Sequence, residues 1–249
     1  MITIKKLKTL KRSTRIRKYV SLLQDFESQI IKKMEINTIY LNSLLKTIEE
    51  DNINTRINEL LKLKIELRSI NNIRHAIMAE LGIEPSEWDF TTPQDKDSYN
   101  KISSGINLYL EDIRSPFNLG SIFRTAECFG VEKIILSNDS TKPDHHRAVR
   151  TAMGSIEYVN WEVGNIDNNN IPVFALELGG IPIDNFIFPK KGIAIIGSEE
   201  FGVSPNALKI ADKSLGRVTI PLYGNKSSLN VSNATAILLQ RWSESTLKV

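Results

Sequence analysis

The 249-residue sequence has one cysteine, Cys128, and lacks long apolar runs. A single cysteine excludes an internal disulfide and a cysteine-rich zinc site. No segment approaches the roughly eighteen apolar residues of a membrane-spanning helix, and no apolar segment typical of a signal peptide follows Met1. We therefore expect a cytoplasmic protein. Because Cys128 stands beside Phe129 in a helical pattern, we expect a buried structural thiol.

Histidine is also scarce, with three in the chain, and two of them are adjacent at His145 and His146. Adjacent side chains point apart on a helix or a strand, and no cysteine or carboxylate cluster stands nearby at ligand spacing. We therefore expect no metal site.

Acidic residues are missing from the first twenty positions, which hold eight basic residues. Residues 21–98 carry 9 basic and 14 acidic residues, and residues 99–249 carry 15 of each. A concentrated cationic arm suits the phosphates of a nucleic-acid backbone through counterion release. A solvated surface without a partner is the alternative, and an anionic membrane is less favoured because large anchoring aromatics are absent. The predicted contacts are Lys5, Lys8, Lys11, Arg12 and Arg15.

Residues 19–81 have the apolar periodicity of helices. Stripes run from Val20 to Ile31, from Ile39 to Ile48, and from Ile57 to Leu67, the last continuing toward Met78. A break is predicted at residues 50–52, and Gly82 ends the helical region. A polar linker containing prolines follows. We therefore predict a helical domain over residues 1–98 and a second domain over residues 99–249.

Three polar segments of the second domain each follow a strand-like run. In the first, the run 106–110 leads through Asn118 and Gly120 into a helix whose apolar face excludes Arg124. In the second, the run 193–196 ends at Gly197 and is followed by the acidic pair 199–200. Ligands of open α/β sheets lie beyond the carboxyl ends of strands, so these loops are expected to share one site.

The third segment runs from Ile220 to Trp242 and places a loop rich in glycine, serine and asparagine before a helical pattern. Ser228 and Asn230 could each cap that helix, which is the ordinary structural interpretation. The same groups also suit a polar ligand held where a helix begins.

Taken in order, the three segments read Asn118-x-Gly-x3-Arg124-Thr-Ala, Gly197-x-Glu199-x2-Gly202 and Ile220-Pro-x2-Gly-x3-Ser228-Leu-Asn-Val-Ser232. They resemble the signature motifs of the SpoU (TrmH-like) RNA ribose 2′-O-methyltransferases of the SPOUT superfamily, over roughly residues 104–245. The resemblance implies an α/β domain with a mainly parallel sheet and a trefoil knot, S-adenosylmethionine as cofactor, tRNA or rRNA as substrate, and a homodimer formed through the catalytic domain.

The resemblance also implies roles for individual residues. The catalytic group would be Arg124, Asn118, Glu199, Ser228 and Asn230, and the cofactor would be held at Leu176, Gly197, Ile220 and Leu229. In this interpretation Asn118 helps to place Arg124, and Glu199 bonds either the third-motif backbone or Asn230. Gly197 and Gly202 would let the backbone approach the ligand. Arg150 would contact RNA phosphate, together with the basic arm.

Two accounts of Arg124 are open, because a guanidinium normally stays charged. Desolvation could allow it to act as the base, or it could stay cationic and stabilise the developing alkoxide while a substrate phosphate takes the proton.

Two other classes of protein are also considered. A Rossmann methyltransferase is disfavoured because Ile181-Pro182 interrupts the glycine pattern at 179–180, which follows a strand expected over residues 173–175. The alternative function is a non-catalytic RNA-binding or assembly factor.

Overall fold

The computed structural model describes residues 2–83, 104–166 and 171–246. The chain divides into two compact units, Met1–Ser98 and Tyr99–Val249. Most of the linker expected after Gly82 lies outside the described residues. Within the described ranges, no helix is both long enough and apolar enough to cross a membrane.

The described part of the first unit is helical. Its helices are α1 (Ile4–Lys8), α2 (Arg12–Ile31), α3 (Thr38–Glu50), α4 (Thr55–Leu61) and α5 (Leu67–Glu80). The predicted break at residues 50–52 is confirmed. The third stripe, expected to continue from Ile57 toward Met78, is divided between two helices, because residues 62–66 separate α4 from α5. There Glu66 N donates to Ser69 Oγ at 2.7 Å, which caps a new helix.

The basic arm is part of the folded unit. Its apolar residues Leu7 and Ile16 are buried in a core shared with α3, α4 and α5. The same unit encloses an ion pair in which Arg74 Nε donates to Glu27 Oε1 at 2.8 Å. Since Leu7 and Ile16 hold α1 and α2 in place, the arm is not a separable tail.

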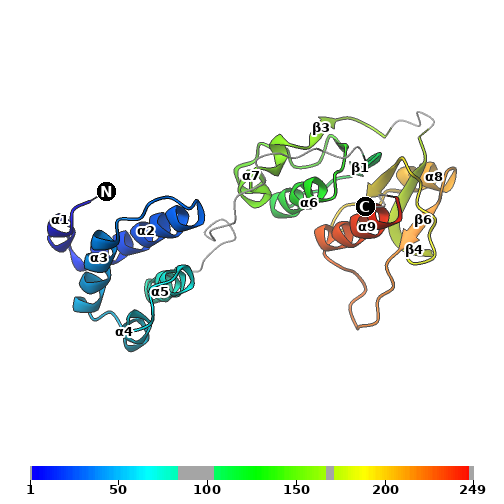
Figure 1. Cartoon of the computed structure of the whole chain (residues 1–249). Helices are drawn as coiled ribbons and strands as arrows, with labels where there is room; N and C mark the ends of the chain where they lie inside the picture. Colours follow the sequence, from blue (N-terminus) through cyan, green and yellow to red (C-terminus); the bar gives the residue numbers. More distant parts are fainter. Residues whose placement is uncertain (1, 84–103, 167–170, 247–249) are drawn as a thin grey trace. The chain divides into compact units, whose positions relative to one another are not determined.

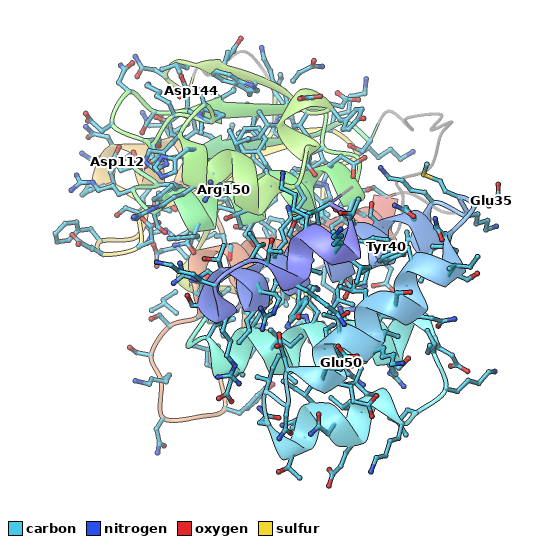
Figure 2. The ribbon with its side chains drawn as sticks, turned by 90° about the vertical axis from the view of Figure 1, so that its left-hand side faces the viewer. Glu35, Tyr40, Glu50, Asp112, Asp144 and Arg150 are labelled. Atoms are coloured by element: carbon cyan, nitrogen blue, oxygen red, sulfur yellow. The ribbon has the colours of Figure 1, made fainter. Side chains whose placement is uncertain are left out.

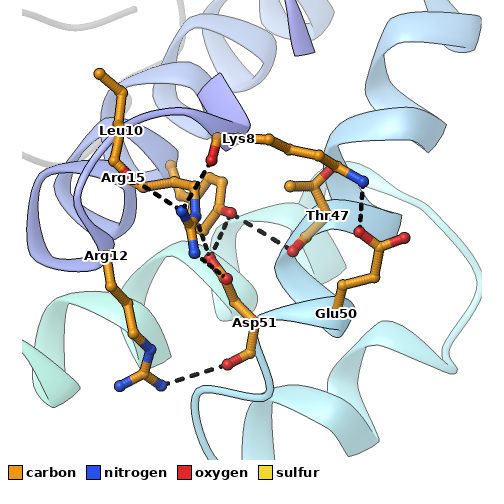
Figure 3. A network of polar contacts seen from close by, with 8 residues as sticks. Lys8, Leu10, Arg12, Arg15, Thr47, Glu50 and Asp51 are labelled. Atoms are coloured by element: carbon orange, nitrogen blue, oxygen red, sulfur yellow. Dashed lines mark hydrogen bonds and ion pairs between the residues drawn. The ribbon is translucent and has the colours of Figure 1, made fainter. Parts of the chain in front are cut away.

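Some of the arm's charge is neutralised within the unit (Figure 3). Arg15 forms a two-pronged ion pair with the carboxylate of Asp51, which also accepts a hydrogen bond from Tyr19 Oη at 2.6 Å. Lys8 pairs with Glu50, and Arg12 donates to the backbone carbonyl of Asp51. Lys5 and Lys11 are exposed and form no ion pair with any residue that the structure describes.

The second unit contains a six-stranded sheet in the order β3-β2-β1-β5-β4-β6, with every described pairing parallel. The strands are β1 (Ile106–Leu110), β2 (Lys133–Leu136), β3 (Asn160–Val163), β4 (Val173–Pro182), β5 (Gly192–Ile196) and β6 (Arg217–Thr219). The helices are α6 (Pro116–Cys128), α7 (His146–Ala152), α8 (Pro205–Asp212) and α9 (Val231–Thr246), with a 3-10 turn at Ser155–Glu157. The expected α/β fold with a parallel sheet is confirmed, whereas the trefoil knot stays a prediction from the resemblance.

The central strands are apolar on both faces because helices cover both faces. On β1, Leu108 and Leu110 enter one core with residues of α6 and α9, while Tyr109 enters a second core with Ala207 and Ala211 of α8. Figure 1 shows α6, α7 and α9 together, with α8 beside β4 and β6. The loops after β1, β5 and β6 therefore lie at the carboxyl edge of one sheet.

Three local expectations fail. Cys128 is exposed, because it lies off the face of α6 that buries Ile122 and Ala126. The rings of His145 and His146 stack with centroids 4.6 Å apart, since His145 precedes α7 with non-helical dihedral angles. The strand expected to end near Ala175 continues as β4 to Pro182, with a shift in its pairing to β6 between Leu176 and Ile181.

Candidate active site

The start of α6 is fixed by capping and by close helix packing. Ser115 Oγ accepts a hydrogen bond from Asn118 N, and Pro116 occupies the first turn, where its missing N–H costs nothing. A Cβ on Gly120 would lie 2.5 Å from the carbonyl oxygen of Ala148, so α7 contacts the backbone of α6 directly. The glycine of the first motif thus sets the distance between two helices.

The loop after β5 closes on itself. Ser198 and Gly202 form a bridge in which each backbone N–H donates to the other's carbonyl, at 3.0 and 3.1 Å. A Cβ on Gly197 would lie 2.1 Å from Gly202 C, and Gly202 itself has φ +67°. Both glycines therefore permit this tight turn, a local reason different from the expected approach of the backbone to a ligand.

Glu199 connects the β5 loop to the β1 loop. Its carboxylate accepts hydrogen bonds from the backbone N–H groups of Arg114 and Ser115, at 3.1 and 3.0 Å, and from Asn118 Nδ2 at 2.9 Å. The backbone that Glu199 binds therefore belongs to the first motif. The third motif is reached through Asn118, whose Oδ1 accepts from Asn230 Nδ2 at 3.0 Å. One residue from each motif thus joins a single chain of hydrogen bonds, Glu199–Asn118–Asn230.

This environment changes the acidity of Glu199. Partial burial raises the pKa of its carboxyl, but the hydrogen bonds from Asn118, Arg114 and Ser115 outweigh burial and hold the pKa below its ordinary value. A carboxylate with a lowered pKa is a weak base. The arrangement therefore suits Glu199 to hold Asn118 rather than to accept a proton.

Asn230 is itself anchored at the start of α9. Its Oδ1 accepts from Ser232 N at 2.9 Å and Ser232 Oγ at 2.6 Å, which leaves Nδ2 to face Asn118. This is the capping arrangement considered for the sequence, and it occurs together with the contact across the site. Ser232 belongs to the third motif, but its part in orienting Asn230 was not predicted.

A cavity of about 110 Å³ lies between the middle of β4, at residues 176–178, and the end of β6. Three of the four residues expected at the cofactor line it, namely Leu176, Ile220 and Leu229, whereas Gly197 does not. Ser228 also lines this cavity and takes no part in the hydrogen-bond chain. The structure therefore separates Ser228 from Asn230, although the sequence suggested one role for both.

The segment 220–229 forms no hydrogen bond with any other described residue. Residues 223–229 are exposed, and the segment leaves the body of the unit between β6 and α9 (Figure 1). Its backbone N–H and C=O groups are consequently open to water or to a ligand. Such groups beside an apolar cavity can hold a molecule that combines ring surface with polar atoms.

Two further carboxylates hold the loops in place. Glu111, directly after β1, accepts hydrogen bonds from Ser204 N and Ser204 Oγ, both at 2.7 Å. Glu177 on β4 accepts from Val203 N at 3.0 Å. Neither role was predicted from the sequence, although each is an acidic residue at the carboxyl end of a predicted strand, as Glu199 is.

Arg124 is exposed on α6 and forms no hydrogen bond or ion pair with a described residue. It follows Asn118 by six residues, which corresponds to roughly 120° of separation around a helix of 3.6 residues per turn. The hydrogen-bond chain therefore does not include Arg124, and the expected contact with Asn118 is not formed. Arg150 is exposed on α7 (Figure 2).

A second cavity, of about 320 Å³, opens between the β1 and β5 loops. Asp112, Arg114, Glu199 and Phe201 are among the residues around it, and Asp112 is labelled in Figure 2. It thus shares Glu199 with the hydrogen-bond chain.

Among the described residues, no group of three or more histidine, cysteine, aspartate or glutamate side chains is placed to hold a metal ion.

Comparisons with known proteins agree with this geometry. The model of the SpoU rRNA Methylase family matches residues 105–240. An uncharacterized tRNA/rRNA methyltransferase of Borreliella burgdorferi is 28% identical over 222 residues, covering 86% of this chain and 87% of that protein. The 23S rRNA (guanosine(2553)-2′-O)-methyltransferase RlmP of Bacillus subtilis is 28% identical over 145 residues, 53% of this chain and 55% of its own.

Among solved structures, the AdoMet-bound rRNA methyltransferase from Sinorhizobium meliloti is 26% identical, with a TM-score of 0.53 over 60% of each chain. The parallel sheet and the loops gathered at its carboxyl edge are those of an open α/β domain that binds its ligand at this edge. The family match covers more than half of the chain, and the chain belongs to the SpoU family of RNA methyltransferases.

Proposed function

We propose that the protein transfers a methyl group from S-adenosylmethionine to a ribose 2′-hydroxyl of a tRNA or an rRNA. The observation that carries this proposal is the chain Glu199–Asn118–Asn230, which draws one polar residue from each motif to the same edge of the sheet. The relative RlmP is named as a 2′-O-methyltransferase, which is the same type of reaction.

The cavity at Leu176, Ile220 and Leu229 fits the cofactor by its chemistry. Apolar side chains suit an adenine ring, and the unpaired backbone groups of residues 220–229 suit its polar edge and an amino-acid moiety. The enclosed volume of about 110 Å³ is below the roughly 300–1,000 Å³ of typical ligand sites. We therefore assign the rest of the wall to the exposed loop 223–229. S-adenosylmethionine supplies a methyl group that is already activated on a sulfonium.

The residues of this chain position the ribose and assist the removal of the proton from its 2′-hydroxyl. Most of the rate of an in-line transfer comes from alignment, which the hydrogen-bonded Asn118 and Asn230 can provide. Glu199 is a poor base because its oxygens already accept three hydrogen bonds. We assign to Arg124 the role of a cation that stabilises the developing alkoxide, with the proton passing to a substrate phosphate.

The distribution of arginine ion pairs supports an RNA substrate. In the second unit Arg217 pairs with Asp212, and Arg241 pairs with Asp184 and Glu244. By contrast, three arginines around α6 form no ion pair with a described residue: Arg114, Arg124 and Arg147. Uncompensated cations on one side of the site suit an anionic backbone.

We also assign RNA-phosphate contacts to Arg150 and to the basic arm of the first unit. Arg150 lies on α7, the helix that packs against α6 and also carries Arg147. In the arm, Lys5 and Lys11 are the strongest candidates, because the charges of Lys8 and Arg15 are balanced by Glu50 and Asp51. Arg12 keeps an exposed guanidinium that donates to a carbonyl group and not to a carboxylate.

We also propose that two copies associate through the catalytic domain. Large apolar side chains stand exposed there, including Tyr223 and Ile237. We take these side chains as candidates for the interface, because association surfaces are rich in exposed apolar side chains. Light scattering coupled to size-exclusion chromatography tests the assignment, with a dimer of the full chain expected and a monomer at micromolar concentration contradicting it.

The alternative function is a non-catalytic RNA-binding or assembly factor on the same fold. Calorimetric titration with S-adenosylmethionine separates the two classes, because such a factor has no need to bind it. A methyltransferase should bind the cofactor and label RNA with the methyl group. Binding without labelling of any RNA, or labelling of a base, would contradict ribose transfer.

A further inference from the structure

The first turns of α6 and α7 bring an aromatic ring and a guanidinium together beside the candidate active site. Phe117 directly precedes Asn118 on α6, and the guanidinium carbon of Arg147, on α7, lies 5.8 Å from the centre of the Phe117 ring. At this distance a cation is attracted to the electron-rich face of an aromatic ring. The pair therefore stands next to a residue of the hydrogen-bond chain that we assign to the ribose.

Both members of the pair are held in place by their helices, which pack against each other (Figure 1). A Cβ on Gly120 would lie 2.5 Å from the carbonyl oxygen of Ala148, so α6 and α7 are in contact through their backbones. Arg147 N donates to His145 Nδ1 at 3.2 Å, which fixes the start of α7. The distance between ring and guanidinium is thus set by the packing of two helices.

The pair is open to solvent. Phe117 is 43% exposed, and Arg147 is exposed and forms no ion pair with a described residue. An exposed phenylalanine on its own is ordinary, but this one carries an uncompensated planar cation beside a reaction site. Aromatic rings and guanidinium planes are the surfaces on which RNA bases stack.

Phe117 lies on the face of α6 that carries Arg124. Seven residues separate the two, which is nearly two full turns of the helix, so their side chains leave it in the same direction. The same spacing places them roughly 10.5 Å apart along the helix axis. A nucleotide whose 2′-hydroxyl is at Arg124 would therefore have a neighbour in the strand at Phe117.

RNA suits this surface better than a protein partner does. The cations without an ion pair in the described chain include Arg114 and Arg124, on α6 and on the loop that leads into it. A nucleic-acid strand fits both parts at once, because its bases cover the ring while its phosphates approach the cations. A protein partner would need an apolar surface and a matching set of carboxylates.

We propose that Phe117 and Arg147 form a stacking platform for the base of the nucleotide next to the methylated one. The base lies against the platform by its ring surface, so the contact selects an unpaired nucleotide and not one particular base. The inference rests on the proposed ribose methylation and adds to it the pair that holds the strand beside the reacting sugar. Both are positioning residues, since neither touches the reacting atoms.

Binding of short single strands tests the stacking before any target is known. Fluorescence anisotropy with the full chain compares labelled oligoadenylate with an abasic ribose-phosphate strand of the same length. Both probes carry the same phosphates, so the difference between their affinities measures contacts to bases. Phe117→Leu should weaken the binding of oligoadenylate by on the order of tenfold and leave that of the abasic strand unchanged. Equal losses on both probes, or no loss on either, would overturn the platform.

Three further measurements separate stacking from structure. Trp161→Leu removes a ring that is 41% exposed on β3, and this matched control should bind oligoadenylate as wild type does; an equal loss there would overturn the assignment to Phe117. Arg147→Lys keeps the charge without the plane and should weaken oligoadenylate binding severalfold while sparing the abasic strand, which tests the platform even where Phe117→Leu folds poorly. A changed molar mass of Phe117→Leu in light scattering would assign this surface to a contact between protein chains and overturn the proposal.

Kinetics with an altered RNA locates the stacked base once the methylated nucleotide is mapped. An abasic site on one side of that nucleotide should lower kcat/KM by on the order of tenfold with wild type, mainly through KM. Phe117→Leu should lose little more on the same RNA, because the two changes remove one interaction. Fully additive losses on both sides of the target would overturn the platform. Oligoadenylate binding that depends on Phe117, without methylation of any RNA, would contradict the proposed function and keep the stacking contact.

Discussion

Asn230 donates from Nδ2 to Asn118 Oδ1 at 3.0 Å, across 112 positions of sequence. Because the other amide atom of Asn118 donates to Glu199, the orientation of this side chain is set from both sides. Three motifs that are distant in the sequence are therefore connected through one amide group.

Asn118→Asp tests this arrangement directly. The new carboxylate would face Glu199 at the position where Asn118 Nδ2 now donates, so two negative charges would meet. We expect kcat/KM for methylation to fall by on the order of a hundredfold at pH 8. The ratio of variant to wild-type activity should rise toward about pH 5.5, because protonation of one carboxylate restores a donor. Asn206→Asp adds the same charge on α8 and should leave activity unchanged; an equal loss there would contradict the assignment.

Arg124→Ala should abolish methyl transfer and leave the affinity for S-adenosylmethionine nearly intact, since Arg124 does not line the cavity at Ile220 and Leu229. Arg124→Lys keeps the charge without the planar fork and should recover part of the rate. Single-turnover kinetics and calorimetry measure the two quantities. Lys209→Ala, a cation removed from α8, is the control. Loss of cofactor binding in Arg124→Ala would assign this arginine to a different role.

Removal of charge from the arm should weaken RNA binding without unfolding the first unit. Truncation of residues 1–18 is unsuitable, because it removes the buried Leu7 and Ile16. We expect Lys5→Gln combined with Lys11→Gln to lower RNA affinity and to flatten the log–log salt dependence by about 0.7–0.9 for each phosphate interaction removed. Lys32→Gln with Lys62→Gln provides a matched pair in the same unit. An unchanged salt slope would exclude phosphate binding by the arm.

The lowered pKa of Glu199 predicts how stability depends on pH. Burial alone would raise this pKa, but the hydrogen bonds from Asn118, Arg114 and Ser115 prevail. The stabilisation by the ionised form is thus fully present above the ordinary value of 4.5 and is lost as the pH falls through the lowered pKa. Calorimetric melting should place Glu199→Gln below wild type at about pH 7, with the difference shrinking as the pH falls below 4.5. A constant difference across this range would refute the linkage.

Features of the fold that depend on residues close together in the sequence could be predicted, whereas features that depend on distant contacts could not. Local patterns correctly predicted α6, with Arg124 off its apolar face, and the break after α3. The separation of α4 from α5 depended on a cap at Ser69 within a continuous apolar pattern, and the exposure of Cys128 depended on which face the sheet covers. Neither the position of such a cap nor the face of a helix that a sheet covers can be deduced from the local pattern of apolar residues.

In the candidate active site, too, the contacts between segments distant in sequence could not be predicted. The motifs named Asn118, Glu199 and Asn230, but their order in the hydrogen-bond chain depends on contacts between loops distant in sequence. Gly197 packs directly against Gly202, five residues away, and Gly120 packs against a backbone carbonyl of another helix. Glu111 and Glu177 belong to none of the three motifs. Their role was identified only from the backbone N–H groups that donate to them in the structure.

The segment 220–229 forms no hydrogen bond with the rest of the described chain. Substitutions at its exposed residues 223–229 should consequently leave the melting temperature almost unchanged while they alter turnover. The effects of a substitution on stability and on activity can therefore be separated at these positions. In a saturation library, selection for expression would ignore these positions, whereas selection for methylated RNA would not.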